Sequence, residues 1–206
     1  MSAAQGTEEW KKERSGCATA SCFDKVMSKG KGGGEAVGRS KYRLQIVTER
    51  LTGIPVEGYT NAIMQRGIDV EPEARMAYEA LRGVVVEEVG FVRHPTIPNC
   101  GCSPDGLVGD EGMVQIKCPE STTHLTWMEA GVVPSEHVAQ MQGEMWVTGR
   151  HWSDFVSYDP RFPEHLRLFV VRLDRDPAYI KNEEQEVRVF LAGVDALEKK
   201  LRERKA

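Results

Sequence analysis

Apolar residues recur at helical spacing over long stretches of the first half of the chain. Leu44, Val47 and Leu51 fall on one face of a helix, with polar residues between them. A longer stretch contains Pro72, which predicts a kink or a break because proline lacks a backbone donor. Gly83 follows that stretch as a C-cap. We predict helices over Thr19–Met27, Lys41–Thr52 and Asn61–Leu81.

The second half contains short, β-branched segments that are bounded by turn residues, as strands are. Asp110, Glu111 and Gly112 form a turn signal, so the segments on either side should pair as a hairpin. We predict strands over Val84–Val86, Glu88–Arg93, Cys102–Val108, Met113–Lys117, Trp152–Tyr158 and Leu166–Leu173.

Two further helices are predicted, over Ser135–Thr148 and Pro177–Lys200. The order of helices, strands, helix, strands and helix indicates an α/β fold with a central mixed sheet flanked by helices. A length of 206 residues and a hydrophobic content of 40% fit a single globular domain. We divide it into a helical part at about 1–82, a sheet core at about 83–175 and a C-terminal helix at about 177–204.

The charge is unevenly distributed along the chain. The net charge is −4, which is not typical of a nucleic-acid-binding protein. Residues 1–66, however, carry 11 Lys and Arg against 7 Asp and Glu. A basic N-terminal part that faces DNA explains this asymmetry, and ordinary scatter of surface charge explains it equally well.

No targeting segment or membrane span is visible in the sequence. The first residues are polar, and no apolar run approaches the roughly 18 residues that a membrane helix needs. We therefore expect a cytoplasmic location. The 5 cysteines are expected to be reduced thiols, and the spacing of Cys100 and Cys102 does not match a zinc site.

The most informative stretch is Ser103-Pro104-Asp105-Gly106, followed by Gln115-Ile116-Lys117-Cys118-Pro119. Asp105 at one end of a hairpin and residue 115 on its partner strand can converge on one metal ion. Lys117 is two residues further along the strand and therefore points to the same face as residue 115. An Asp followed by Glu-x-Lys is how nucleases with the PD-(D/E)xK motif hold a divalent metal beside a phosphodiester. An aspartate in a turn would by itself be ordinary. A lysine in an otherwise apolar strand, however, needs an acidic partner, and the acidic site at Asp105 supplies one for Lys117.

A further carboxylate should come from elsewhere in the chain. Glu71, on the long helical stretch, is the best candidate, with Asp69 and Glu73 as competitors. The carbonyl oxygen of Ile116 can also serve as a ligand. Mg²⁺ prefers such hard oxygen donors, and Lys117 can orient the attacking water and stabilise developing charge.

These residues resemble the family of phage lambda exonuclease and the YqaJ-type viral recombinases, within the PD-(D/E)xK superfamily. The similarity covers roughly residues 10–175. Besides the hairpin, it rests on Trp10-Lys11-Lys12-Glu13-Arg14, Thr19-Ala20-Ser21, Ala139-Gln140-Met141-Gln142, Met145-Trp146-Val147-Thr148 and Tyr158-Asp159-Pro160-Arg161.

The resemblance implies a restriction-endonuclease-like fold and an exonuclease that digests one strand of linear double-stranded DNA from 5′ to 3′. It implies dependence on Mg²⁺, with Mn²⁺ as a substitute, and a ring-shaped homotrimer. The product is a 3′ single strand for a partner annealing protein, and the place of action would be a bacterial host cell. By motif position, Glu71, Asp105, residue 115 and the Ile116 carbonyl would be metal ligands, and Lys117 would be the catalytic lysine.

The resemblance also implies contacts with the DNA. Arg14, Ser21, Ser103 and Gln140 would form a pocket for the 5′-terminal phosphate, in which Arg supplies a forked charged donor. Met64 would be an apolar wedge that splits the terminal base pair, although a Met at helical spacing is as often in the core. Lys29 and Lys31, in a glycine-rich loop, would reach DNA ahead of the site, unless that loop is simply solvated.

Gln115 departs from the family, which has Glu at this position. Glutamine has nearly the same shape but no charge, so it should weaken metal binding and strongly reduce cleavage while DNA binding remains. Either the Gln is an introduced substitution that traps an uncut complex, which the intact motifs favour, or the chain is a natural inactive relative. Alternative functions are a catalytically dead DNA-end-binding module, a restriction-like endonuclease that cuts internally, and an interaction role for the C-terminal helix.

Overall fold

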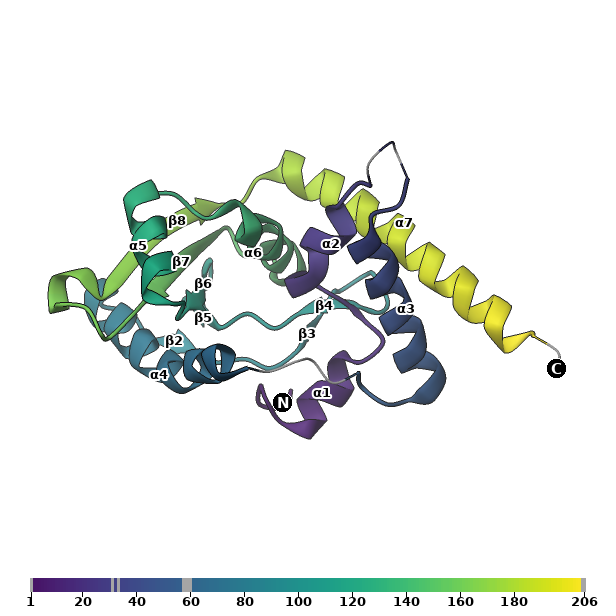
Figure 1. Ribbon diagram of the computed structural model, residues 1–206, viewed down its shortest axis with the longest axis horizontal. Helices are drawn as coiled ribbons and strands as arrows, with labels where there is room; N and C mark the ends of the chain where they lie inside the picture. The colour runs from purple at the N-terminus through teal and green to yellow at the C-terminus, as the bar shows by residue number, and fades with distance from the viewer. Residues whose placement is uncertain (1, 31, 33, 57–60, 205–206) are drawn as a thin grey trace.

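The computed structural model describes residues 2–30, 32, 34–56 and 61–204 (Figure 1). The helical elements are α1 (Glu8–Arg14), η1 (Ala20–Cys22), α2 (Phe23–Met27), α3 (Val37–Thr52), α4 (Ala62–Arg82), α5 (Ser121–Ala130), α6 (Ser135–Thr148), η3 (Glu164–Leu166) and α7 (Pro177–Arg202). The strands are β1 (Ala18–Thr19), β2 (Val86–Glu87), β3 (Val92–Arg93), β4 (Cys100–Cys102), β5 (Gly106–Val108), β6 (Gly112–Lys117), β7 (Trp152–Tyr158) and β8 (Leu168–Asp174).

The central sheet has five strands in the order β2-β5-β6-β7-β8. Only β6 and β7 run parallel, and the other neighbours are antiparallel, so the sheet is mixed as predicted. The predicted hairpin is the β5–β6 pair, in which Gly106 lies opposite Val114. Figure 1 shows α4 on one side of this sheet and α5 and α6 on the other. The fold is therefore an α/β fold with a central mixed sheet flanked by helices, as expected.

The predicted strand Cys102–Val108 is wrong, because the structure divides it between two sheets. Cys102 ends β4, which pairs with β1 and β3 in a separate three-stranded sheet. Gly106 begins β5 in the central sheet. Between them Pro104 cannot donate a hydrogen bond to a strand ladder, so the chain changes sheet there. This crossover places Asp105 at the entrance to the hairpin.

Of the kink or break predicted at Pro72, the break is wrong, since α4 runs unbroken through that residue. Pro72 removes the hydrogen bond to the carbonyl of Ile68. Ile68 is 60% exposed, so water can take the place of that donor. The helix is fixed at its ends instead: the Asn61 side chain accepts from the Met64 amide, and Gly83 has the left-handed φ of 65° expected of a C-cap.

Two apolar cores hold the layers together. One lies between α4 and the central sheet and includes Tyr78, Val114 and Val156. The other joins α2, α3, α6 and α7 around residues such as Phe23 and Phe190. Because both faces are covered, β6 is almost entirely buried and its polar side chains lie inside the protein.

Helices α1 and α5 have no counterpart in the sequence prediction, and each is short. In α1 the Thr7 side chain caps the helix by accepting from the Trp10 amide. Within the described residues, none of the helices combines the length and the apolar character that a bilayer crossing requires.

Candidate active site

The β5–β6 hairpin brings Asp105 and Gln115 into direct contact. Asp105 Oδ2 accepts a hydrogen bond from the Ile116 amide at 2.7 Å and another from Gln115 Nε2. Gln115 is 0% exposed. The convergence of these two residues, predicted from their spacing, is therefore present in the structure.

The amide of Gln115 has a defined orientation. Its nitrogen faces Asp105, and its oxygen accepts from Gln140 Nε2 at 2.7 Å. The same Gln140 nitrogen donates to Glu144 Oε1 at 2.9 Å. The arrangement is a directional series of hydrogen bonds from helix α6 to Asp105, with Gln115 in its middle.

Glu71 is the acid on α4 that approaches this pair. Burial and, after it, the charge of Asp105 together raise the pKa of Glu71 to about 7, against the opposing charge of Arg75. Arg75 donates to Glu71 at 2.9 Å. The two competitors lie elsewhere: Asp69 accepts from Gln65 on the same helix, and Glu73 accepts from Tyr158.

Two partly buried acids, Asp105 and Glu71, lie in the field of one lysine, Lys117. Burial raises the pKa of Asp105, and the charge of Lys117 and the hydrogen bond from the Ile116 amide oppose that rise. Burial also lowers the pKa of His137 to about 4, and Lys117 adds to the effect. A cation beside Asp105 and Glu71 would relieve their mutual repulsion.

The donor set fits a divalent cation in part. The carboxylates of Asp105 and Glu71 and the carbonyl of Ile116 are hard oxygen donors. At residue 115, the group that faces Asp105 is an N–H₂ group, which donates hydrogen bonds and does not ligate. No cluster of three or more His, Cys, Asp or Glu side chains is placed to hold a metal in the part of the chain that the structure describes. Three oxygen donors remain, which should hold a cation more weakly than a site with a third carboxylate.

Three of the four residues predicted to bind a 5′-phosphate form a second cluster. Arg14 Nη2 donates to Ser21 Oγ at 3.3 Å, and its guanidinium lies 4.3 Å from the centre of the Trp10 ring. Trp10 Nε1 in turn donates to Ser103 Oγ at 3.0 Å. The fourth, Gln140, makes its contacts with Gln115 and Glu144 instead, so its role at the phosphate stays a prediction.

Trp10 therefore links Arg14 to the loop that precedes Asp105. Trp10 belongs to one of the motifs that carry the family resemblance, but the sequence alone assigned it no role. The signal for such a role was its indole N–H group, because a partly buried tryptophan usually finds a hydrogen-bond partner for that group.

A groove of about 580 Å³ opens beside this cluster. Its lining includes Trp10, Arg14, Tyr42, Ile54 and Met64. Met64 is 51% exposed, so the alternative reading of it as a core residue is wrong. It stands on α4 seven residues before Glu71, close to the same helical face.

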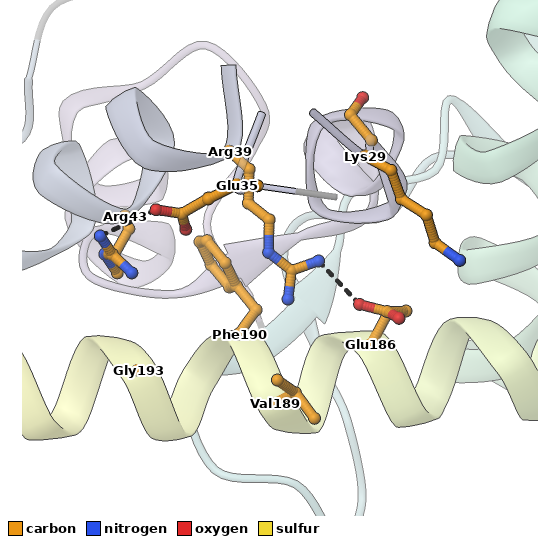
Figure 2. A pocket seen from close by; sticks show the side chains of 10 residues that line it. Lys29, Glu35, Arg39, Arg43, Glu186, Val189, Phe190 and Gly193 are labelled. Atoms are coloured by element: carbon orange, nitrogen blue, oxygen red, sulfur yellow. Dashed lines mark hydrogen bonds and ion pairs between the residues drawn. The ribbon is translucent and has the colours of Figure 1, made fainter. Parts of the chain in front are cut away.

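The glycine-rich loop borders a different pocket, between α3 and α7 (Figure 2). Lys29 lines it, together with Arg39, Glu186 and Phe190. Arg39 and Glu186 are paired there at 2.8 Å. Lys31 lies outside the described residues. The DNA contacts predicted for these lysines remain predictions.

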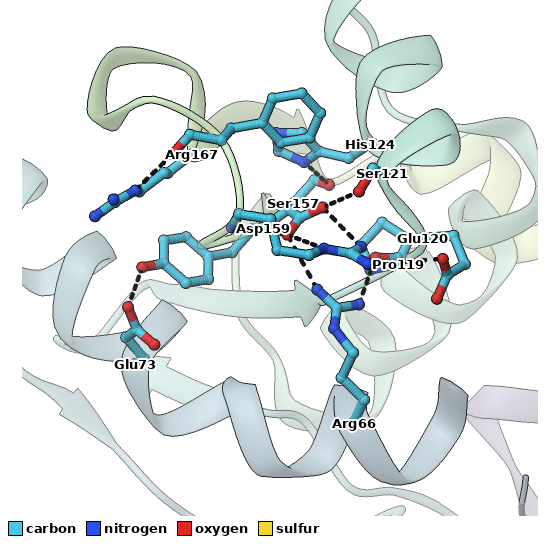
Figure 3. Close-up of polar contacts among 12 residues, drawn as sticks. Arg66, Glu73, Pro119, Glu120, Ser121, His124, Ser157, Asp159 and Arg167 are labelled. Atoms are coloured by element: carbon cyan, nitrogen blue, oxygen red, sulfur yellow. Dashed lines mark hydrogen bonds and ion pairs between the residues drawn. The ribbon is translucent and has the colours of Figure 1, made fainter. Parts of the chain in front are cut away.

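A third polar cluster ties α4 to the end of β6 (Figure 3). Arg66 donates to the Pro119 carbonyl and to Asp159, both at 3.0 Å. Asp159 also accepts from Ser121 at 2.7 Å and from Arg161 at 2.8 and 2.9 Å. This cluster fixes the helix that carries Glu71 relative to the strand that carries Lys117.

The family profile described as YqaJ-like viral recombinase domain matches residues 9–151, which is more than half of the chain. The chain belongs to the YqaJ-like viral recombinase family. A search among curated proteins gave no match.

Solved structures extend the likeness of this YqaJ-like protein over its whole fold. LHK-Exo, an alkaline exonuclease from Laribacter hongkongensis, is 44% identical with a TM-score of 0.88, covering 95% of this chain and 96% of that one. A structure of LHK-Exo in complex with dAMP matches at 45% identity, with the same TM-score and coverage. A phage-related exonuclease from Haemophilus somnus, at 17% identity and a TM-score of 0.71 over 90% and 96% of the two chains, shares the fold.

The likeness to LHK-Exo supports a nuclease role for this YqaJ-like chain. PD-(D/E)xK nucleases generally depend on a divalent metal, and Asp105, residue 115 and Lys117 occupy the positions of that motif.

Proposed function

We propose that this protein has the framework of a Mg²⁺-dependent 5′→3′ exonuclease for linear double-stranded DNA, and that Gln115 arrests it before cleavage. Mn²⁺ is expected to substitute for Mg²⁺. The observation that carries the proposal is the orientation of the Gln115 amide, whose nitrogen donates to Asp105 and whose oxygen is held by Gln140. The chain would then bind 5′ ends and leave them uncut.

Each residue of the site has a role in this proposal. Asp105, Glu71 and the Ile116 carbonyl would hold the ion, which when bound supplies an activated water and neutralises charge on the phosphate. Lys117 orients the water and stabilises developing negative charge. Gln115 donates a hydrogen bond to Asp105, whereas a glutamate at this position would supply an anionic oxygen to the ion.

The Arg14 cluster is expected to select the 5′ end. Its guanidinium, with the Ser21 and Ser103 hydroxyls nearby, offers donors to the oxygens of a terminal phosphate. The dAMP complex of LHK-Exo supports a nucleotide-binding role for this fold. Met64, exposed in the adjoining groove, would part the terminal base pair, and the single strand left behind would be passed to an annealing protein.

The decisive experiment restores the carboxylate. Gln115→Glu should digest 5′-phosphorylated linear duplex in Mg²⁺ at least about 100-fold faster than the chain as it stands, the scale seen when one preorganised charge contact is removed from an active site. Closed circular DNA should remain intact, whereas a restriction-like endonuclease would cut it. An inactive Gln115→Glu variant would leave only a DNA-end-binding module.

End recognition is tested separately, in Ca²⁺ at low salt. Duplexes with a 5′-phosphate should bind more tightly than those with a 5′-hydroxyl, and Arg14→Leu should remove the difference, about 10- to 100-fold for a charged hydrogen bond. Arg188→Leu is the matched control, because Arg188 pairs only with Glu184 on the surface of α7 among the contacts described. Equal affinity for the two ends in the unmodified chain would argue against the pocket.

The trimeric ring and the annealing partner rest on the family resemblance. Light scattering should give three times the 23.0 kDa of one chain. Binding of an annealing protein through α7 should be lost on Val189→Asp, which changes an exposed position of that helix and leaves its buried face intact.

A further inference from the structure

Two acidic side chains lie fully inside the protein without the partners that buried charges need. Glu144 on α6 is 1% exposed and Glu183 on α7 is 0% exposed. Glu144 Oε2 and both carboxyl oxygens of Glu183 have no hydrogen-bond partner among the described residues. Buried polar groups are otherwise nearly always satisfied, so these three oxygens call for an explanation.

The two acids lie on α6 and α7, which pack against each other, and Glu183 reaches the backbone of α6 beside Glu144. A Cβ atom added to Gly143, the neighbour of Glu144, would lie 3.2 Å from Glu183 Oε2. Glycine at 143 thus allows the Glu183 carboxyl group to approach the backbone of α6. The charge of Glu144 is also the one that acts on Glu183.

Few positive charges oppose the pair. Lys117 is the one cation that acts on Glu144, and none acts on Glu183 among the groups described. The other titratable groups that face them are Asp105, Cys100, Cys102 and Tyr179.

Two ionised carboxylates cannot both remain in such a place. Removing a charge from water without a partner costs so much that the group takes up a proton instead. Burial raises the pKa of Glu144 to about 8, with the charge of Asp105 adding to it. Burial also raises the pKa of Glu183 to about 8, with the charge of Glu144 adding to it. A proton between two carboxyl groups supplies the donor that their free oxygens lack.

Glu144 is also one end of the series of hydrogen bonds that reaches the active site. It accepts from Gln140 Nε2, which holds Gln115, which in turn contacts Asp105. A carboxyl oxygen at Glu144 fixes the Gln140 amide with its nitrogen toward residue 115. An amide free to rotate would present its oxygen there half of the time.

We propose that Glu144 and Glu183 hold a proton between them and act as positioning residues that orient Gln140 toward residue 115. The importance of this orientation for cleavage rests on the proposed function; the shared proton does not. The two parts are therefore tested by different measurements.

The first measurement is the pH dependence of unfolding in urea for the chain as it stands. A group whose pKa is raised by folding stabilises the protein fully below its unfolded value and loses that effect as pH rises through the folded value. For these acids the window runs from 4.5 to about 8. Each proton bound only in the folded state makes the unfolding constant rise about tenfold per pH unit.

Glu183→Gln should remove most of this slope. The amide has the same size and donates to Glu144, so Glu144 no longer needs the shared proton. Glu184→Gln is the control, because Glu184 is its neighbour in sequence but pairs with Arg188 at the surface. An unchanged slope in Glu183→Gln, or the same loss of slope in Glu184→Gln, would overturn the proposal.

The second measurement uses kinetics in the Gln115→Glu background. Glu144→Gln should lower kcat about 10-fold with KM unchanged, and adding it to Gln140→Leu should cause no further loss, because both act through one amide. Additive losses, or a change in KM alone, would reject the positioning role. Should Gln115→Glu be inactive, the proposed function has failed, and the unfolding measurement still decides whether the proton is shared.

Discussion

Replacing Asp159 with Asn is expected to lower the free energy of unfolding by about 3 kcal/mol, because it removes the charge at the centre of a buried ion-pair cluster. Asp159 is 0% exposed. It accepts hydrogen bonds from Arg66, Arg161 and Ser121. Asparagine keeps the shape but places an N–H₂ group against donors.

The magnitude follows from the number and surroundings of these bonds. Net contributions of about 1.5–3 kcal/mol for each charged hydrogen bond would exceed 3 kcal/mol if they were additive. The loss is smaller because Arg66 and Arg161 are 24% and 46% exposed and regain water when the charge is removed. For a chain of this size, about 3 kcal/mol corresponds to a fall in Tm of roughly 6–12 °C.

The assay is urea unfolding at pH 7, with thermal unfolding as a second measure. The matched control is Asp195→Asn, which removes an aspartate that also pairs with an arginine, Arg50, but is 64% exposed. An exposed pair of this kind contributes about 1 kcal/mol or less. A loss in Asp159→Asn no larger than in the control would refute the assignment of Asp159 as the centre of the cluster.

The pH dependence supplies an independent check. Burial of Asp159 acts to raise its pKa, but the hydrogen bonds from Arg161 and Ser121 outweigh it and lower the pKa from 3.8 to about 2. A lowered pKa stabilises the fold above 3.8, and the effect is lost as pH falls toward about 2. The stability gap between the chain and Asp159→Asn should be constant from pH 5 to 8 and shrink below about pH 4.

Two further pairs of substitutions test the packing and the groove. Gly143→Ala should destabilise the fold by about 1–3 kcal/mol in urea, because the added Cβ would lie 2.4 Å from the Phe23 ring. Gly38→Ala, whose Cβ would meet only one side-chain atom at 4.0 Å, should stabilise α3 by up to about 1 kcal/mol, and equal effects of the two would contradict this. Met64→Ala in the Gln115→Glu background should slow digestion of blunt duplex about 10-fold, with little effect on a mismatched 5′ end and a change in stability within about 0.5 kcal/mol. Met76→Ala, at an exposed position on the same helix, should leave both rates unchanged, and equal slowing on the two substrates by Met64→Ala would argue against the wedge.

The spacing of apolar and polar residues along the chain was enough to predict the elements that frame the active site. The predicted bounds of α6 and β7, Ser135–Thr148 and Trp152–Tyr158, are those of the structure. The meeting of Asp105 with residue 115 also followed from a turn signal and the two-residue period of a strand. These features depend on neighbours in the sequence, so the sequence contains the information needed to predict them.

Contacts between distant elements were beyond the reach of local pattern. The division of Cys102–Val108 depends on which strand each half finds as a partner. The partners of Gln140, the proximity of Glu144 to Glu183 and the hydrogen bonds to Asp159 depend on how helices pack on the sheet. From their neighbours in the sequence alone, Glu144, Glu183 and Asp159 would each be predicted to be ordinary surface residues.

The sequence by itself determined the α/β class, the hairpin that brings Asp105 to residue 115 and the departure at Gln115. Only the tertiary structure decided which way the Gln115 amide faces, because its partners come from the connection between β4 and β5 and from α6. It also decided that Met64 is exposed, since burial depends on what packs against a helix face. Side-chain chemistry is local, whereas its protonation, orientation and exposure are set by elements that meet only after folding.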